Sequence, residues 1–277
     1  MPSRPEPDHA MRLGGRTAVV VGAGTIGPGW SNGKACAAQY ARDGAVVACV
    51  DFVAARAEET VARIRDEGGD AFPLCADATD AAAMAAVVEQ VVSRTGRLDI
   101  MHNNVGVGFS IGAPDAIAPD AWDREIAQNL TSAYLGIRYA VPAMRAAGGG
   151  VVINTSSLLA VRFLKQPNVG YSVGKAGVEA LTRACAAAYG RDGIRVNCLR
   201  IGFAETPLIE KGLEARQLSP EAREIELAKS RAKVPLRQEH TSPFDVAQTA
   251  AFLASDDARH ITGVILNVDG GLEAAPL

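Results

Sequence analysis

A tyrosine and a lysine in this chain have the types and spacing of an acid–base pair. In the segment Tyr171-Ser-Val-Gly-Lys175, the two side chains share one face of a predicted helix, because residues four apart are neighbours on a helical surface. An ammonium group beside a phenol lowers the phenol's pKa from about 10. Such a tyrosine can exchange a proton with a reacting oxygen. A serine pair, Ser156 and Ser157, precedes it.

A glycine-rich segment near the start of the chain is placed to hold phosphate groups. It runs from Gly22 to Gly33, between the short apolar run Thr17–Val21 and a predicted helix. The backbone N–H groups of such a turn, and the N-terminus of the helix after it, can bind a pyrophosphate. A tight turn in any open sheet has a similar sequence, so this segment alone is weak evidence.

An acidic residue ends the second predicted strand. Asp51 directly follows Ala45–Val50, where a carboxylate can accept hydrogen bonds from an adenosine ribose and repel a 2′-phosphate. The next residue is Phe52, not the arginine that a phosphorylated ribose favours. We therefore predict NAD, with NADP the weaker alternative. Two nearby cations, Lys34 and Arg56, would reverse the preference, and a cap of the following helix is the other interpretation of Asp51.

Strand-like and helix-like segments alternate along the chain. The predicted strands are Thr17–Val21, Ala45–Val50, Ala71–Cys75, Leu98–His102, Val151–Thr155, Arg195–Leu199 and Val264–Val268. The predicted helices are Gly33–Arg42, Ala54–Glu67, Ala81–Arg94, Trp122–Ala147, the helix of Tyr171 and Lys175, and Pro243–Ala254. This alternation predicts an α/β protein with a parallel sheet covered by helices on both faces.

Composition excludes several classes of function. The chain has 277 residues, 48% of them hydrophobic, and a net charge of -3, so no basic surplus indicates nucleic-acid binding. Its five cysteines are scattered and its four histidines lack ligand spacing, so we predict no disulfide frame and no metal. The cysteines, expected as buried thiols, are Cys36, Cys49, Cys75, Cys185 and Cys198. Without a segment typical of a signal peptide or a membrane span, the predicted location is cytoplasmic.

From about Leu13 to Gly271, the chain resembles the short, single-domain branch of the short-chain dehydrogenase/reductase family. The ordered motifs that carry the resemblance are the Gly22 loop, Asp77-Ala-Thr-Asp80, Asn103-Asn-Val-Gly106, Asn129, Ser157, Tyr171-x-x-x-Lys175, Arg195-Val-Asn197 and Gly202–Pro207. The resemblance implies a Rossmann-type doubly wound parallel sheet, a nicotinamide cofactor, and a homotetramer or homodimer. We expect one catalytic domain, residues 13–277, behind a flexible leader of residues 1–12.

Carried over by position, the resemblance implies four catalytic residues. Tyr171 would exchange the proton at the substrate oxygen, and Ser157 would hold that oxygen by a hydrogen bond. Lys175 would lower the pKa of Tyr171 and bind the nicotinamide ribose, while Asn129 would position a water that relays protons. The implied cofactor contacts are Gly22, Ala23, Gly24, Thr25, Asp51, Asp77, Ala78, Asn104, Gly106, Tyr171, Lys175, Ala204 and Thr206.

Several positions depart from the family's pattern. About five extra residues within Ile26–Asn32 lengthen the glycine loop, so either Gly27 or Gly29 stands for its middle glycine. The extra Pro28-Gly-Trp30 would fold over the cofactor or bulge into solvent. Val21 replaces a threonine. Ile201 replaces a proline, and this second change would loosen the loop at the nicotinamide.

The interval from the serines to Tyr171 is one residue longer than is common in the family. Ser156 is therefore an alternative to Ser157 as the catalytic serine. After Ser157, the apolar residues Leu158, Leu159, Phe163 and Leu164 suggest a substrate wall, with Arg162 and Lys165 as anchors for an anionic group.

The segment of about residues 207–240 is the expected substrate loop. It is an irregular stretch rich in charged residues, and such a stretch is first a solvated outer face, although it is also the natural candidate for a lid.

We predict an NAD(H)-dependent oxidoreductase that interconverts a secondary alcohol and a ketone, acting on a small molecule. An NADP-dependent carbonyl reductase is one alternative. A non-catalytic dinucleotide-binding regulator or scaffold is another, disfavoured because all four catalytic residues are present. A nucleotide-sugar epimerase or dehydratase would need a larger C-terminal domain than the residues after Gly202 provide.

Overall fold

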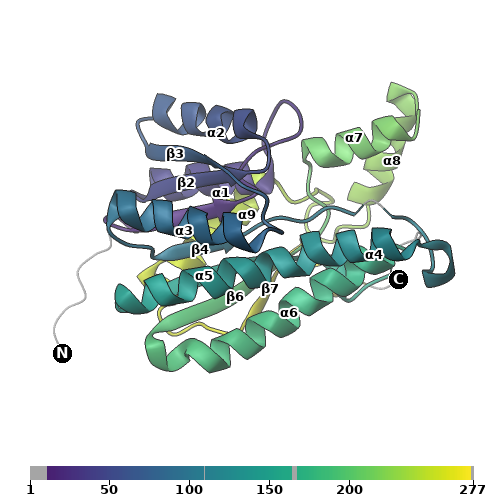
Figure 1. Ribbon diagram of the computed structural model, residues 1–277. Helices are drawn as coiled ribbons and strands as arrows, with labels where there is room; N and C mark the ends of the chain where they lie inside the picture. Colours follow the sequence, from purple (N-terminus) through teal and green to yellow (C-terminus); the bar gives the residue numbers. More distant parts are fainter. Residues whose placement is uncertain (1–10, 109, 164–166, 276–277) are drawn as a thin grey trace.

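The computed structural model describes residues 11–108, 110–163 and 167–275. Seven parallel strands form one sheet in the order β3-β2-β1-β4-β5-β6-β7 (Figure 1). They are β1 (Thr17–Val21), β2 (Val46–Asp51), β3 (Asp70–Cys75), β4 (Ile100–Asn103), β5 (Gly150–Ser157), β6 (Ile194–Ile201) and β7 (Ile265–Val268). The predicted doubly wound parallel sheet is confirmed.

Helices cover both faces of the sheet. One layer contains α1 (Asn32–Arg42), α2 (Ala54–Asp66) and α9 (Pro243–Ala254); the other contains α3 (Ala81–Thr95), α5 (Ser132–Ala146) and α6 (Val169–Tyr189). Side chains of β1 alternate between the layers, since Ala18 and Val20 pack with the first and Val19 and Val21 with the second. A strand buried on both faces explains the continuous apolar runs in the sequence.

The carboxyl ends of the strands bring the predicted site residues to one edge. Gly22 follows β1, Asp51 ends β2, Asn104 follows β4, and Ser157 ends β5. The chain order reverses between β1 and β4, and in open parallel sheets ligands bind at such a switch point. The fold therefore places these residues at the switch point of the sheet.

The helix predicted over Trp122–Ala147 is interrupted. It consists of α4 (Pro119–Ile126), a π-helical turn η3 (Ala127–Thr131) and α5. Asn129 lies within the π turn. Such turns frequently occur at functional sites. The described residues also include four short 3-10 helices: η2 (Pro114–Ala116), η4 (Leu158–Ala160), η5 (Gly190–Asp192) and η6 (Asp256–Ala258).

The substrate segment is more regular than its sequence predicts. It forms α7 (Pro207–Ala215) and α8 (Pro220–Arg231), which project away from the sheet (Figure 1). Both helices begin with proline, and Ser219 caps α8 by accepting a hydrogen bond from the Ala222 N–H. None of the described residues of α8 is buried, which agrees with a solvated outer face.

Most of the predicted leader, residues 1–10, lies outside the described residues. Arg12 is packed, since it pairs with Asp43 and donates to Gln248 Oε1 at 3.1 Å. Arg12, which lies one residue before the expected boundary at Leu13, therefore has defined side-chain contacts. Cys75 is exposed, contrary to the expectation of buried thiols, because it ends the edge strand β3.

The described helices and polar clusters add two findings. None of these helices is long and apolar enough to cross a membrane. Among the same residues, no group of three or more His, Cys, Asp or Glu side chains could hold a metal ion.

Candidate active site

The end of β5 and the first turn of α6 bring Ser157 and Tyr171 together. The Ser157 hydroxyl lowers the pKa of Tyr171, but burial of the phenol is the larger effect and raises that pKa. The net direction is upward. This corrects the expectation that Lys175 holds the tyrosine pKa below its ordinary value in the protein alone.

Ser156 points to the other side of β5. It is 2% exposed, and its Oγ lies 2.9 Å from Glu179 Oε1 and 3.2 Å from the carbonyl oxygen of Lys175. Ser156 is thus engaged by Glu179 and Lys175, while Ser157 is the serine whose hydroxyl affects Tyr171.

Lys175 lies at the centre of the site. Its Nζ donates to the carbonyl oxygens of Val105 (3.0 Å) and Thr155 (2.9 Å) and lies 5.8 Å from the centre of the Tyr171 ring. Burial lowers the pKa of Lys175 to about 8. A Cβ on Gly106 would lie 2.4 Å from this nitrogen, so the loop after β4 must have glycine there.

Asn129 holds the loop after β4 against the π turn. Its Nδ2 donates to the carbonyl oxygens of Val107 (2.8 Å) and Glu125 (2.9 Å), and its Oδ1 accepts from the Val107 N–H (3.2 Å). The side chain is 1% exposed. These bonds explain an asparagine inside a helical segment, a position that this residue otherwise disfavours.

The glycine turn and Asp51 form one unit. Gly22 has a φ of 80°, a left-handed conformation that favours glycine, and its N–H donates to the Val50 carbonyl at 2.9 Å. Asp51 Oδ2 accepts from the Gly24 N–H and Oδ1 from the Val53 N–H, both at 3.0 Å. The residue that caps α2 is Val53, so the helix-cap interpretation of Asp51 is wrong. Each carboxylate oxygen has a further lone pair for a ligand hydroxyl.

Ser31 closes the lengthened glycine loop. It caps α1, accepting from the Lys34 N–H at 3.1 Å, and its hydroxyl donates to the Gly24 carbonyl at 2.7 Å. The residue that caps the start of α1 is therefore Ser31, and not Gly27 or Gly29. The helix still approaches β1 closely, because a Cβ on Gly33 would lie 2.0 Å from the Gly22 carbonyl oxygen.

The extra residues pack on protein. The Trp30 ring lies 4.9 Å from the ring of Phe244 on α9, centre to centre. A Cβ on Gly27 or Gly29 would lie 3.4 Å or 3.7 Å from the Pro207 side chain at the start of α7. Trp30 thus neither bulges freely into solvent nor needs a cofactor as its packing partner.

The remaining predicted cofactor residues lie in turns after the strands. Asp77 Oδ1 accepts two hydrogen bonds from Thr79, while Ala78 is buried. Asn104 Nδ2 donates to the Gly22 carbonyl at 3.2 Å, which joins the loops after β1 and β4. The others are Ala23 and Thr25 in the glycine turn, Ala204 in a bridge to Thr241, and Thr206 as the cap of α7.

Two polar connections were only partly visible in the sequence. His102 reaches Asn104 through Thr155 Oγ1, at 3.2 Å and 3.3 Å. Burial lowers its pKa to about 3, so the imidazole is neutral. Glu179, which pairs with Arg200, was not predicted. The signal for it was its helical spacing from Tyr171 and Lys175, which places all three on one face of α6.

One of the two expected anion anchors, Arg162, is bound to the protein's own backbone. Arg162 Nη1 faces three C-terminal carbonyl oxygens, those of Leu272, Glu273 and Ala275, at 2.7 Å, 2.8 Å and 2.9 Å. Lys165 and Leu164 lie outside the described residues. Of the expected apolar wall, Leu158 is buried and Phe163 is 70% exposed.

A separate cavity of about 580 Å³ opens at the amino ends of the strands. It is lined by Arg16, Arg97, Asp99 and Arg195, among others, and contains none of the predicted site residues. Arg97 pairs with Asp99 at 2.6 Å, and Arg195 donates to the Ser255 carbonyl at 3.0 Å. The predicted chemistry lies at the opposite edge of the sheet.

Known proteins with the same sequence pattern and fold place the chain in a family. The family model described as enoyl-(acyl carrier protein) reductase matches residues 29–273. A solved structure described as a short-chain dehydrogenase/reductase from Burkholderia xenovorans matches with a TM-score of 0.91 at 38% identity, over 97% of this chain and 100% of that one. The chain belongs to the short-chain dehydrogenase/reductase family.

Among the relatives whose names state an activity are two dehydrogenases. The cis-4-hydroxycyclohexanecarboxylate dehydrogenase of Sinomonas cyclohexanicum is 37% identical, with 94% of this chain and 97% of that protein covered. The cyclohexanol dehydrogenase of an Acinetobacter species is 34% identical, with coverage of 94% and 95%. The chain is an oxidoreductase of a family that binds NAD or NADP.

The residues at the switch point fit such a dinucleotide. A Cβ on Gly24 would lie 2.6 Å from Asp51 Oδ2, so the turn leaves its backbone bare. Beside it stand an acceptor carboxylate, the N-terminus of α1 and a buried lysine. This donor and acceptor set suits a pyrophosphate and ribose hydroxyls.

Proposed function

We propose that this protein interconverts an alicyclic secondary alcohol and its ketone with NAD(H), using Tyr171 as the acid–base group. The observation that carries the proposal is the cluster of Ser157, Tyr171 and Lys175, in which the serine hydroxyl lowers the pKa of the phenol and the buried lysine has its Nζ 5.8 Å from the centre of the ring. This arrangement suits a proton transfer at one oxygen atom.

Each residue has a distinct task in this proposal. Ser157 and the Tyr171 hydroxyl bind the substrate oxygen, and Tyr171 takes its proton during oxidation or returns it during reduction. Lys175, with its lowered pKa near 8, is poised to exchange a proton near neutral pH. A bound nicotinamide supplies the hydride acceptor or donor.

Asn129 completes the proton path in the proposal. Both hydrogens of its side-chain amide are already donated to carbonyl oxygens. It would therefore hold a relay water through an acceptor, namely its main-chain carbonyl or the second lone pair of Oδ1.

The preference for NAD rests on the charges around the glycine turn. Asp51 presents a carboxylate there, which would repel a 2′-phosphate. Lys34 is 5% exposed and its Nζ pairs with Glu59 at 2.6 Å, so its charge is already neutralised. Arg56, whose stem lies beside Gly24, is the cation in a position to favour NADP.

The substrate class comes from the two named relatives, which act on cyclohexane-ring alcohols by their names. An apolar ring suits the side chains near the site, since Leu159 follows the serine and Phe163, Leu208 and Ile209 are exposed on the adjoining loop and α7.

Replacement of Tyr171 tests the proposal. We expect wild-type protein to reduce NAD⁺ with cyclohexanol or a substituted cyclohexanol, and Tyr171→Phe to lose roughly 100-fold or more in kcat because the proton acceptor is gone. The dissociation constant for NADH, from a fluorescence titration, should stay within about twofold. Full activity of Tyr171→Phe would show that another group transfers the proton.

A further inference from the structure

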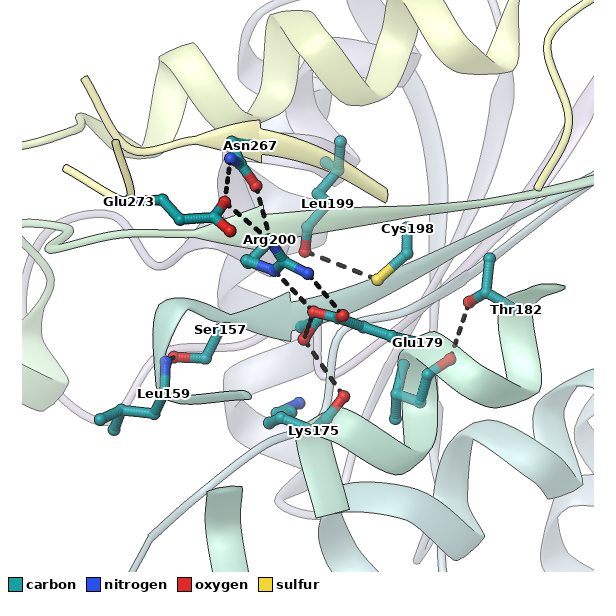
Figure 2. A network of polar contacts seen from close by, with 12 residues as sticks. Ser157, Leu159, Lys175, Glu179, Thr182, Cys198, Leu199, Arg200, Asn267 and Glu273 are labelled. Atoms are coloured by element: carbon teal, nitrogen blue, oxygen red, sulfur yellow. Dashed lines mark hydrogen bonds and ion pairs between the residues drawn. The ribbon is translucent and has the colours of Figure 1, made fainter. Parts of the chain in front are cut away.

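A buried ion pair lies behind the serine–tyrosine–lysine cluster. Arg200 of β6 donates from Nε to Glu179 Oε1 at 2.7 Å and from Nη2 to Glu179 Oε2 at 2.6 Å (Figure 2). The two residues are 8% and 4% exposed. A buried ion pair adds little stability over an apolar pair of the same size, because both charges lose their hydration. Stability alone is therefore a weak reason for this pair.

Glu179 joins the serine strand to the tyrosine helix. It lies one turn after Lys175 on α6 (Figure 2). Its Oε1 is 2.9 Å from Ser156 Oγ. A hydroxyl has a single proton, and the charged carboxylate is nearer than the Lys175 carbonyl at 3.2 Å. The proton therefore goes to Glu179, which fixes the residue before Ser157 to the helix that carries Tyr171.

The same arginine reaches the C-terminal segment, residues 269–275. Arg200 Nη1 donates to Glu273 Oε2 at 2.7 Å, and Asn267 of β7 donates to that oxygen as well. Asp269 accepts the Glu273 N–H at 2.8 Å, so the segment folds into a turn. Arg200 thus contacts two carboxylates, one on each side.

A second arginine holds this segment from the loop after Ser157. Arg162 Nη1 has two hydrogens and faces three carbonyl oxygens of residues 272, 273 and 275. Arg162 and Arg200 therefore clamp the C-terminal segment between the serine loop and β6. The segment also packs on Gly202, where a Cβ would lie 2.7 Å from Asp269 Cβ, at the start of the loop to Thr206.

We propose that Glu179 and Arg200 are positioning residues for the active site, and that Glu273 makes the C-terminal segment part of it. The pair fixes the spacing between Ser157 and Tyr171, and the clamped segment forms one wall beside the serine loop. This inference rests on the proposed function for its catalytic readout.

A double variant separates positioning from stability. In Glu179→Leu/Arg200→Met, both charges are replaced by apolar side chains, a change that buried pairs often tolerate in folding. We expect a melting temperature and an NADH dissociation constant close to wild type. We also expect kcat to fall roughly 10- to 100-fold, because a shift of about 1 Å at a reacting group has that effect. The apparent pKa in the kcat/KM profile should rise as Tyr171 moves away from Ser157, whose hydroxyl lowers the pKa of the phenol. Wild-type kcat in the folded double variant would overturn the proposal.

A surface variant covers the case in which the double variant does not fold. Glu273→Gln removes one charge at a side chain that is 32% exposed, and Asp192→Asn is its matched control, since Asp192 is also 32% exposed and pairs with Arg145 at 2.7 Å far from the site. We expect Glu273→Gln alone to lower kcat several-fold and to speed hydrogen exchange in peptides around Ser157 and the start of α6.

The exchange measurement stands even if the proposed function fails. If wild-type protein oxidises none of the cyclohexanols, the alcohol assignment is wrong, while faster exchange at Ser157 in Glu273→Gln still supports the coupling. Exchange and kcat equal to those of Asp192→Asn would overturn it.

Discussion

At the scale of single residues, burial decides the charge states in the site. Burial lowers the pKa of Lys175 from its ordinary 10.5 to about 8. An unfolded chain keeps this proton to higher pH, so between about pH 8 and 10.5 the unfolded state binds more protons and the folded state gains stability as pH rises. The buried lysine thus lowers the stability of the folded state near neutral pH, and its role in the site is its chemistry.

Lys175→Met should expose this dependence. Between pH 8 and pH 10, the free energy of unfolding of wild type should rise relative to that of the variant by on the order of 2 kcal/mol, as measured by urea denaturation. The reason is that only wild type has the titrating group. Lys229→Met, at a lysine that is 67% exposed, is the control and should show no such trend. Parallel curves for wild type and Lys175→Met would mean that the lysine keeps an ordinary pKa.

Asp51 sets the second prediction at this scale. Asp51→Ala should weaken NADH binding and strengthen NADPH binding, because the variant loses the ribose acceptor and the charge that repels a 2′-phosphate. Thermal-shift titrations with both cofactors measure the change, since a ligand raises the melting temperature with its affinity. Wild-type protein stabilised more by NADPH would make Arg56 the phosphate-binding cation instead.

At the scale of elements, the lengthened glycine loop joins the cofactor turn to α7. Trp30 anchors it on Phe244, while the residues around Gly27 and Gly29 pack on Pro207. Deletion of Ile26–Trp30 should leave NADH affinity within about twofold, because Ser31 still caps α1. The KM for the alcohol should rise several-fold as α7 loses this support.

Trp30→Ala is the matched control for the deletion. It removes the ring packing at full loop length, so it should lower the melting temperature and leave the alcohol KM nearly unchanged. A deletion variant with a wild-type KM for the alcohol would show that the loop does not support α7.

At the scale of the whole molecule, a single chain leaves apolar side chains exposed on its helical layer. Tyr134 of α5 and Val173 of α6 are each 45% exposed. Together with the family resemblance, this favours a homo-oligomer. Light scattering should give two or four times the chain mass of 28.8 kDa. A monomer at micromolar concentration would contradict the prediction.

The sequence by itself determined what depends on local pattern. Apolar β-branched runs predict β1 with its observed bounds, and Pro243 with its capping Ser242 marks the start of α9. Motif spacing brought together the residues of the carboxyl edge, because parallel strands all end there. The charged segment after Thr206 was harder to predict, since both of its helices are short and none of the described residues of α8 is buried.

Only the tertiary structure decided what depends on contacts through space. The packing of β5 on α6 engages Ser156 with Glu179 and leaves Ser157 as the serine that affects Tyr171. Ile201, expected to loosen its loop, instead extends β6, because its register pairs it with Ser157 and Val268. The pairing of Glu179, Arg200 and Glu273 joins residues distant in the sequence. Burial, which reverses the expected shift of the Tyr171 pKa, exists only once those elements pack together.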